Sequence, residues 1–429
     1  MMSLLQSLSG IVVIVLISYL FSENRSHISW RFVLKGLFLQ FSLTIILLKL
    51  SIFQSLFHQI NNGILAIQDG TKAGTSLVFG YLGGGPLPFI ESNEGMSFIL
   101  GFQALPMMLV ISALSAVLYY LRILPIVIGI FAWFLSRVLG ISGPASFAVI
   151  STIFVGMVEA PLLIRPYLKD LSRTELFIIM SSGMATISGT VLVIYAGFLS
   201  SVIPNSSEHL IVASIISAPA AIMLSMTAIP PTDPTIFKPR FSDAFYIKPT
   251  SHFYTSIMDA ITQGTIQGLK LLVNVIAMLI VLVALVSILN SLLNTLPNVF
   301  DSPLSLQRMI GWVMAPFAWC LGIEAKDIQI AGKLLGTKLV LNEFIAYLEL
   351  SKISILELSE KSRILLTYLL CGFANFGSLG IVIGGLTSMI PERSQEVLSL
   401  GFRSLLVGTL ATSLSGIMAG IVLFTESPW

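Results

Sequence analysis

Long apolar runs with almost no charged residues constrain this chain more than any other feature of its sequence. These runs cover residues 8–22, 37–53, 99–121, 210–229 and 271–290. Helices of this kind cross the roughly 30 Å hydrocarbon core of a bilayer. Only 10% of the residues are charged and 55% are hydrophobic, whereas soluble domains carry about 25% charged residues. The sequence therefore predicts an all-α polytopic membrane protein.

Composition also excludes several functions. The formal net charge is only +2 and no basic block occurs, so we expect no nucleic-acid partner. Cys320 and Cys371 lie in apolar segments, where lone thiols usually serve as packing residues. The histidines lack metal-ligand spacing; they are His27, His58, His209 and His252. No Ser-His-Asp or Cys-His arrangement is present, so the sequence predicts neither an enzyme nor a bound cofactor.

The positions of Lys and Arg predict the orientation in a cell inner membrane, because cytoplasmic loops carry an excess of both. The main basic clusters are Arg25, Arg31 and Lys35; Arg122 and Arg137; Arg165, Lys169 and Arg173; Lys238, Arg240 and Lys248; and Arg393 and Arg403. Placing all of them in the cytoplasm puts both termini outside. Lys352, Lys361 and Arg363 oppose this scheme, although glutamates dilute them. The first apolar run lacks a basic leader and a cleavage pattern, so we expect a membrane span and not a signal peptide.

Two apolar segments are interrupted in a way that simple spans are not. The interrupting residues are Ser142, Gly143, Pro144, Gly156, Glu159 and Pro161 in residues 141–167, and Gly332, Lys333, Gly336, Lys338, Asn342 and Glu343 in residues 331–350. Irregular backbone at membrane depth needs protein or a water-filled cavity around it. Both segments therefore predict re-entrant helical hairpins that enter the membrane and turn back.

The two interrupted segments look like counterparts in the two halves of the chain. Each is followed by a stretch of glycine and polar residues, at 183–189 and at 372–378. On the predicted topology, one hairpin enters from inside and the other from outside. This is the arrangement of an inverted repeat, whose interrupted segments meet near the bilayer midplane around the substrate. We expect about eight transmembrane helices plus two re-entrant hairpins.

Glu159 and Glu343 are the first candidates for a functional site. An ionisable side chain inside a membrane is costly and usually marks a site of function. The alternative is a structural ion pair, for instance between Glu343 and either Lys338 or Lys333.

Polar residues near the second glutamate are further candidates. Asn375 and Ser378 are three residues apart, which would place both on one helix face toward the same small polar ligand. Hydrogen bonding between membrane helices is the alternative role. Phe373 could form a platform for a ligand or serve as a packing residue.

A cation site is a candidate in the first half. Thr186, Ile187 and Ser188 lie between glycines, where a helix can unwind and expose carbonyl groups. Unwound carbonyls and hydroxyls are ligands that suit a sodium ion. Ordinary packing of small residues between helices is the alternative.

An ordered series of motifs resembles the concentrative nucleoside transporters, in the form of a bacterial member. Residues 153–156 (IFVG) with 159–167 (EAPLLIRPY) resemble the family's first hairpin, and residues 183–187 (GMATI) resemble the helix that follows it. The segments that resemble the second half are 336–338 (GTK), 342–344 (NEF), 346–347 (AY) and 371–378 (CGFANFGS). Residues 102–106 (FQALP) resemble the span before the first hairpin. The resemblance runs from about residue 78 to residue 420, which is most of the chain.

This resemblance implies a homotrimer whose protomers each have a scaffold domain and a mobile transport domain. Substrate would lie between the hairpin tips and would be driven by a cation gradient. The implied substrate-binding residues are Glu343, Asn375 and Ser378 at the ribose hydroxyls, Phe373 and Val191 beside the base, and Glu159 near the base. A sodium site would use Thr186 with the main-chain oxygens of Val155 and Ile187.

The sequence departs from the family at the base-binding positions. The family usually has Gln and Thr just before the first hairpin glutamate, whereas this chain has Met157 and Val158. Loss of two hydrogen-bonding groups can change discrimination between substrates by several kcal/mol. The ribose side is therefore expected to be intact and the base side altered.

The cation positions depart as well. Thr152 stands where sodium-coupled members have Asn, and Ala145 stands where Glu is common. Threonine keeps one oxygen, so sodium coordination would be weakened but not lost. Proton coupling through Glu159 or Glu343 is the alternative, because a carboxyl group in the membrane interior can bind a proton at neutral pH.

Together these features predict a cation-coupled symporter that imports nucleosides by an elevator-type alternating-access mechanism, with Na⁺ or H⁺ as the co-transported ion. The alternatives are a symporter for another ribosyl or polyol-like solute, and a non-transporting ligand sensor with the same fold. The expected division of the chain is 1–100, N-terminal transmembrane helices and an extracellular segment; 101–140, a scaffold helix and an interfacial helix; 141–230, the first hairpin and following helices; 231–325, a linker with a second scaffold helix and interfacial helix; and 326–429, the second hairpin and following helices.

Overall fold

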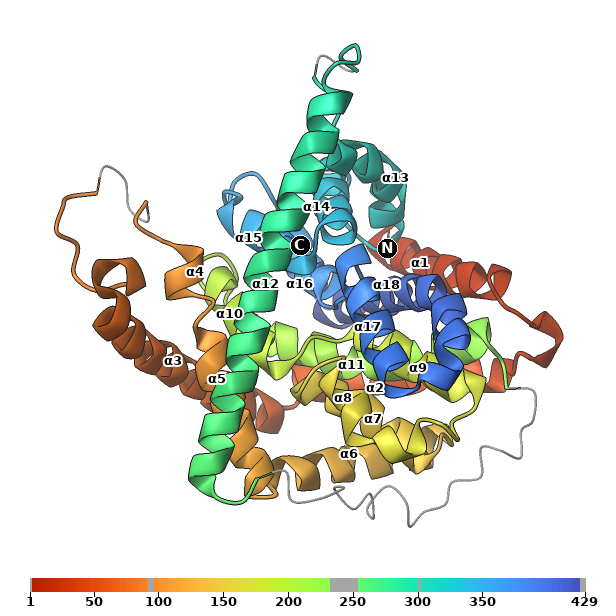
Figure 1. Ribbon diagram of the computed structural model, residues 1–429. Coiled ribbons are helices and arrows are strands. Elements are labelled where there is room, and N and C mark those ends of the chain that lie inside the picture. Colours follow the sequence, from red (N-terminus) through yellow and green to blue (C-terminus); the bar gives the residue numbers. More distant parts are fainter. Residues whose placement is uncertain (1, 92–95, 232–253, 300–301, 425–429) are drawn as a thin grey trace.

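The computed structural model describes residues 2–91, 96–231, 254–299 and 302–424, and these residues are helical apart from loops and one isolated β-bridge (Figure 1). The helices are α1 (Met2–Leu20), α2 (Trp30–Lys49), α3 (Ser51–Phe79), α4 (Leu100–Gln103), α5 (Met107–Tyr120), α6 (Ile123–Leu139), α7 (Gly143–Phe154), α8 (Glu159–Leu163), α9 (Arg173–Ala185), α10 (Gly189–Leu199), α11 (Ser206–Ala228), α12 (Ile257–Leu293), α13 (Leu306–Cys320), α14 (Ile328–Val340), α15 (Glu343–Lys352), α16 (Glu360–Leu370), α17 (Phe376–Met389) and α18 (Ser394–Phe424). Short 3₁₀ helices are η1 (Arg25–His27), η2 (Gly80–Gly83), η3 (Arg165–Tyr167), η5 (Ala325–Asp327) and η6 (Pro391–Arg393). The basic cluster of Lys238, Arg240 and Lys248 lies outside the described residues.

Within the described ranges, 6 helical stretches are long and apolar enough to cross a membrane. They are Trp30–Lys49, Leu100–Tyr120, Arg173–Leu199, Ser206–Ala228, Ile257–Leu293 and Pro391–Phe424. The predicted run 210–229 matches α11 to within a few residues, and the run 271–290 lies inside α12, toward its C-terminal end. The extent predicted for run 37–53 is wrong, because α2 ends at Lys49 and the extended backbone of Leu50 separates it from α3.

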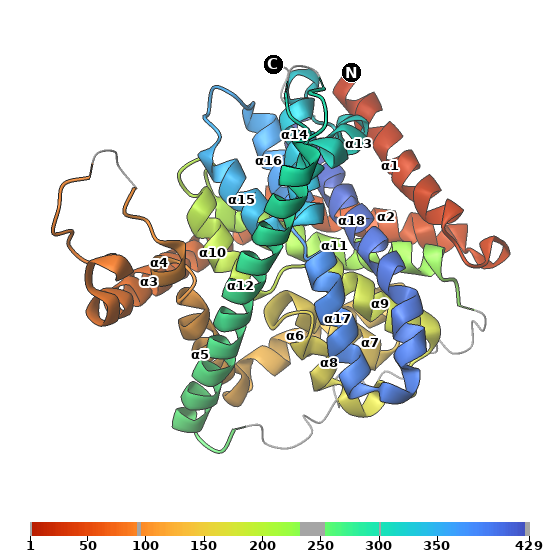
Figure 2. The same ribbon diagram turned by 45° about the horizontal axis from the view of Figure 1, so that its top comes forward.

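The long helix α12 runs along one side of the molecule beside α5 (Figures 1 and 2). Glycines let the two backbones approach closely. A Cβ atom at Gly264 would lie 2.8 Å from the Ala113 Cα, and one at Gly268 would lie 2.9 Å from the Leu109 Cα. Most of the apolar side chains of α12 are exposed, and few residues of its most apolar stretch are buried. By contrast, α9, α11 and α18 pack together in the buried centre.

The order of elements in the second half repeats that in the first. Helices α5 and α6 precede the α7–α8 pair, and the broken pair α9–α10 leads to α11. In the same order, α12 and α13 precede α14–α15, and the broken pair α16–α17 leads to α18. Helices α6, α7 and α8 lie toward one end of α12, whereas α13 and α14 lie toward the other (Figures 1 and 2).

Both interrupted segments are helix–turn–helix units, as predicted. The first turns at residues 155–158 and the second at residues 341–342. Gly156 has φ 119°, and a Cβ atom there would lie 2.7 Å from the Glu159 Oε2. The expected interruption at Ser142-Gly143-Pro144 is wrong, because these residues begin α7. The Ser142 hydroxyl caps the helix, and Pro144 occupies its first turn, where a missing N–H costs nothing.

Candidate functional site

Two helix breaks meet at the centre of the molecule. Helix α9 ends at Ala185 and α10 begins at Gly189, so residues 186–188 are unwound as predicted. Helix α16 ends at Leu370 and α17 begins at Phe376. A Cβ atom at Gly372 would lie 2.9 Å from the Met184 carbonyl oxygen and 3.0 Å from that of Ala185. The two unwound segments therefore touch.

Glu343 lies buried near this junction, with only 4% of its surface exposed. The Tyr195 hydroxyl donates to Oε1 at 2.7 Å, and the Asn375 Nδ2 donates to Oε2 at 2.7 Å. The Lys338 ammonium instead donates to a main-chain carbonyl, and Lys333 is exposed. Among the described residues, neither lysine forms a direct ion pair with Glu343. The structure thus favours a polar site over the alternative of a structural ion pair.

Two helix N-termini lie beside this carboxylate. Glu343 is the first residue of α15, whose end is capped by Asn342 through its Oδ1 and the Ile345 N–H at 2.9 Å. Asn375 caps α17 in the same way, because its Oδ1 accepts from the Ser378 N–H at 2.7 Å. Helix N-termini carry partial positive charge, which stabilises a nearby anion. Asn375 therefore precedes the helix and caps it, and does not lie within the helix as predicted, whereas Ser378 lies in its first turn.

Tyr195 is the residue that the sequence analysis missed. It is 1% exposed on α10, and its ring lies 4.7 Å from that of Tyr347 and 5.9 Å from that of Phe344. A buried tyrosine usually needs a hydrogen-bond partner for its hydroxyl. The sequence signal that could have found it is a tyrosine inside the apolar stretch 189–199.

The tip of the first hairpin packs between elements of both halves. A Cβ atom at Gly183 of α9 would lie 3.0 Å from the Met157 Cβ, and one at Gly385 of α17 would lie 3.3 Å from the Val158 Cγ1. Glu159 begins α8 with an exposed side chain, so it does not share the buried environment of Glu343.

The remaining predicted substrate residues lie on the two broken pairs. Val191 is buried near the start of α10, and Phe373 is half-buried in the second break. Ser378 is buried in the first turn of α17.

The predicted cation residues lie where the first hairpin meets the first break. The Thr186 hydroxyl lies 2.9 Å from the Thr152 hydroxyl and 2.9 Å from the Ser182 carbonyl oxygen. The Ile187 carbonyl accepts from the Ser214 hydroxyl at 3.1 Å. Val155 follows the last residue of α7.

The donor set at this place suits a hard monovalent cation. It consists of hydroxyl and carbonyl oxygens, which are the ligands that sodium prefers at unwound helices. One turn before Thr186, the buried Ser182 hydroxyl forms no hydrogen bond with any described residue, which leaves its oxygen free nearby. Among the described residues, no group of three His, Cys, Asp or Glu side chains could hold a transition metal.

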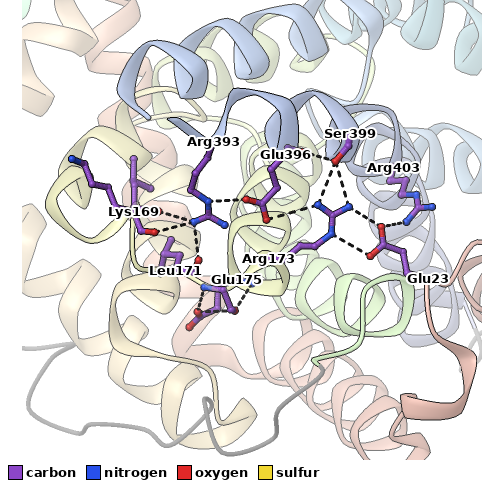
Figure 3. Close-up of polar contacts among 11 residues, drawn as sticks. Glu23, Lys169, Leu171, Arg173, Glu175, Arg393, Glu396, Ser399 and Arg403 are labelled. Atoms are coloured by element: carbon purple, nitrogen blue, oxygen red, sulfur yellow. Dashed lines mark hydrogen bonds and ion pairs between the residues drawn. The ribbon is translucent and has the colours of Figure 1, made fainter. Parts of the chain in front are cut away.

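A network of ion pairs joins three parts of the chain (Figure 3). Arg173 at the start of α9 holds Glu23 with two hydrogen bonds, at 2.8 and 3.2 Å, and Arg403 of α18 contacts the same carboxylate. Arg393 binds Glu396 at 2.7 Å and the Leu171 carbonyl at 2.7 Å. Several of the basic residues predicted to be cytoplasmic therefore lie on one face.

Comparisons with known proteins agree with this geometry. Residues 9–82 and 209–420 match the models described as the N-terminus and C-terminus of Na⁺ dependent nucleoside transporters, and residues 101–202 match the model described as nucleoside recognition. An uncharacterized transporter of Haemophilus influenzae is 35% identical over 98% of both chains. The putative nucleoside permease NupX of Escherichia coli is 34% identical, with 98% of this chain and 99% of that protein covered. The human solute carrier family 28 member 3 is 34% identical over 97% of this chain, which spans 60% of that protein's length.

Solved structures carry the same fold. CNTnw in an inward-facing substrate-bound state is 31% identical, with a TM-score of 0.87 over 98% of both chains. A variant of CNTnw in an outward-facing state gives a TM-score of 0.88 over 99% of both chains. The fold and the site thus define a multi-pass membrane transporter and not an enzyme. This chain belongs to the concentrative nucleoside transporter family.

Proposed function

We propose that this protein is a cation-coupled symporter that imports nucleosides across the inner membrane. The observation that carries this proposal is the buried contact between Glu343 and Asn375 at the meeting point of the two helix breaks. A carboxylate accepts hydrogen bonds and an amide both donates and accepts, so the pair suits the adjacent hydroxyls of a ribose. Ser378 adds a hydroxyl group in the first turn of α17.

The arrangement of the two halves supports an elevator-type mechanism. On this proposal, residues 141–230 and 326–429 form the transport core, and α7–α8 and α14–α15 are re-entrant hairpins of an inverted repeat with about eight transmembrane helices. Residues 1–100 supply the N-terminal transmembrane helices and an extracellular segment. Residues 101–140 supply a scaffold helix and an interfacial helix, and residues 231–325 supply a linker and the second pair of such helices. On this proposal the protein assembles as a homotrimer, and the exposed apolar side of α12 faces lipid or a neighbouring protomer. The ion-pair network of Figure 3 would face the cytoplasm, with both termini outside.

The nucleobase would meet a mostly apolar wall. Met157, Val158, Val191 and Phe373 would line it, with Glu159 at its edge. Apolar groups give contact area but little discrimination between bases. We therefore propose that the protein accepts several nucleosides.

The cation would bind between Thr152, Val155, Thr186 and Ile187. We favour sodium over a proton because the ligands there are hydroxyl and carbonyl oxygens. The descriptions of the matching family models also include sodium, as does that of the rat sodium/nucleoside cotransporter 2, which is 34% identical. Proton binding at Glu159 or Glu343 is the alternative.

Equilibrium binding to the purified protein tests the proposed substrate. Uridine and adenosine are expected to bind. 2′,3′-dideoxyuridine is expected to bind at least about 10-fold more weakly, because it lacks the two hydroxyl groups that would hydrogen-bond to Glu343 and Asn375. Equal binding of uridine and its dideoxy form would contradict ribose recognition. Binding of a base-free riboside as tight as that of uridine would favour the second candidate, a transporter of other polyol-like solutes, which the apolar Met157 and Val158 suggest.

A further inference from the structure

Lys338 is a buried cation that the proposed function does not use. It lies on α14 and is only 3% exposed. Its ammonium group donates to the Leu369 carbonyl at 2.8 Å and lies 3.4 Å from the Thr412 hydroxyl. A lysine inside a membrane protein is costly to bury, and such a residue marks a functional position by default.

The position of Lys338 in the second half equals that of Thr152 in the first. Thr152 lies two residues before the end of α7, and Lys338 lies two residues before the end of α14. Both helices are the first arms of their hairpins. The repeated order of elements therefore places the two side chains at matching sites.

The partners of the two side chains match as well. Thr152 contacts Thr186, which directly follows the last residue of α9. Lys338 contacts the carbonyl of Leu369, the residue before the end of α16. Each hairpin thus reaches the C-terminal end of the first helix in its own broken pair.

The last helix of each half contributes a hydroxyl group at its own break. Ser214 of α11 hydrogen-bonds both the N–H and the carbonyl of Ile187, at 3.2 and 3.1 Å. Thr412 of α18 lies beside the Lys338 ammonium. The surroundings of the two positions therefore share a hairpin residue, a helix C-terminus and a hydroxyl from the last helix.

Charge distinguishes the two positions. The C-terminal end of a helix carries partial negative charge, which favours a cation there. In the first half, the groups at this place are neutral oxygens. In the second half, the same place holds a lysine ammonium, which also attracts the Glu343 carboxylate electrostatically.

We propose that Lys338 is a tethered cation that permanently occupies, in the second half, the place that a transported cation occupies in the first. This proposal rests on the proposed cation site at Thr152 and Thr186. Lys338 acts through the Leu369 carbonyl and the second helix break, so it is a positioning residue. It keeps the break that carries Asn375 in shape at any sodium concentration, and it leaves one exchangeable cation place per protomer.

Thermal unfolding of the purified protein without nucleoside tests the proposal, in sodium chloride and in choline chloride. Lys338→Thr gives the second half the residue of the first, whereas Lys338→Met keeps the length without the charge. In choline chloride both variants are expected to melt about 5 °C or more below the wild type. In sodium chloride, the difference in melting temperature from the wild type is expected to become smaller for Lys338→Thr. For Lys338→Met it is expected to stay the same, because this variant keeps only the sodium response of the first half. Lys333→Thr, an exposed lysine on the same helix, is the control and should respond as the wild type does.

The reciprocal substitution in the first half provides a second test if the Lys338 variants do not fold. Thr152→Lys places a tethered ammonium in the first half, so the sodium-dependent rise in melting temperature should vanish, whereas Thr152→Ser should retain it. Equal sodium responses of Lys338→Thr and Lys338→Met, or an unchanged response of Thr152→Lys, would overturn the proposal. A wild type that does not respond to sodium would overturn it too. Since no arm contains nucleoside, failure of nucleoside binding would count against the proposed function alone.

Discussion

At Glu343, two donors and two helix N-termini surround one buried carboxylate. The Glu343→Gln substitution replaces one acceptor oxygen with an NH₂ group that faces a donor. Charge-assisted hydrogen bonds contribute about 1.5–3 kcal/mol each. Nucleoside affinity is therefore expected to fall at least about 10-fold, as measured by equilibrium binding.

Two further variants make this result specific. Tyr195→Phe removes one hydrogen-bond donor to Glu343 and keeps the ring. The expected loss of nucleoside binding free energy is therefore smaller, about 1 kcal/mol. Glu357→Gln changes an exposed glutamate after α15 and should leave binding unchanged. An effect of Glu357→Gln as large as that of Glu343→Gln would point to a general effect of charge.

Val158 offers a test of base recognition. The Val158→Thr substitution conserves shape and introduces a hydroxyl group at the hairpin tip, next to Gly385. The variant should then bind nucleosides whose bases hydrogen-bond to this hydroxyl more tightly than other nucleosides, by up to about 10-fold in affinity. The measurement is the ratio of uridine to adenosine affinity in the variant and the wild type. A ratio that stays unchanged would argue against a base at this tip.

Some residues of the candidate site could be predicted from the sequence and others could not. The intramembrane charge of Glu343 is visible in any hydropathy pattern, so it could be identified as a candidate. The role of Asn375 as a helix cap could not, because capping depends on where α17 begins. Tyr195 lies 148 residues from Glu343 along the chain, and only the fold brings the two together.

Among the elements, the second helix break makes the sharpest demand on backbone geometry. Gly372 has φ 151°, and a Cβ atom there would lie 2.7 Å from the Thr412 Cγ2 as well as against two carbonyl oxygens of α9. Gly372→Ala is expected to destabilise the protein by about 2–4 kcal/mol, because both strain and overpacking result. Thermal unfolding measures this loss.

A second glycine provides a matched control. Gly380 lies in α17, and a Cβ atom there would meet nothing within 4 Å. Gly380→Ala should leave stability unchanged or raise it by up to about 1 kcal/mol, because alanine favours the helical state. Equal melting temperatures for the two variants would contradict the close contact between the breaks.

The sequence predicts the hairpins and the first break because glycine, proline and polar residues are rare inside apolar helices. The same signal misleads at Ser142-Gly143-Pro144, since a cap and a first-turn proline use the same residue types as a turn. Residues 372–378 are predicted to be helical, because glycine, asparagine and serine also occur where membrane helices pack closely or hydrogen-bond to each other.

On the scale of the whole molecule, Glu23 joins the loop after α1 to α9 and α18 (Figure 3). The hydrogen bond from Arg173 lowers the pKa of Glu23 below its usual value, with help from the charge of Arg403. Stability from a carboxylate with a lowered pKa is present above its unfolded pKa of about 4.3, and is lost as the pH falls through the folded pKa.

The Glu23→Gln substitution should therefore lower stability at pH 7 by about 1 kcal/mol or less, since these groups are partly exposed. The difference from the wild type should shrink as the pH falls below about 4. Melting temperatures of both proteins across this pH range measure the effect. A difference that grows at low pH would contradict the assigned role of the network.

Residue patterns are enough to predict that the chain is a membrane protein, because lipid requires apolar helices. They also predict the repeated order of elements, because both halves contain an interrupted apolar segment followed by a stretch rich in glycine and polar residues. Contacts between the halves could not, since the meeting of Gly372 with α9, or of Val158 with α17, depends on how the helices cross.

Uptake into proteoliposomes tests the central claim most directly. Labelled uridine and adenosine are supplied with an inward sodium gradient, an inward proton gradient or neither, and Glu343→Gln serves as the inactive control. The account predicts accumulation above equilibrium with the sodium gradient, and none with Glu343→Gln. Accumulation driven only by the proton gradient would show that the coupling ion is a proton, which would bind at Glu159 or Glu343. Absence of accumulation under every gradient, in protein that binds nucleoside, would contradict transport and indicate a ligand sensor.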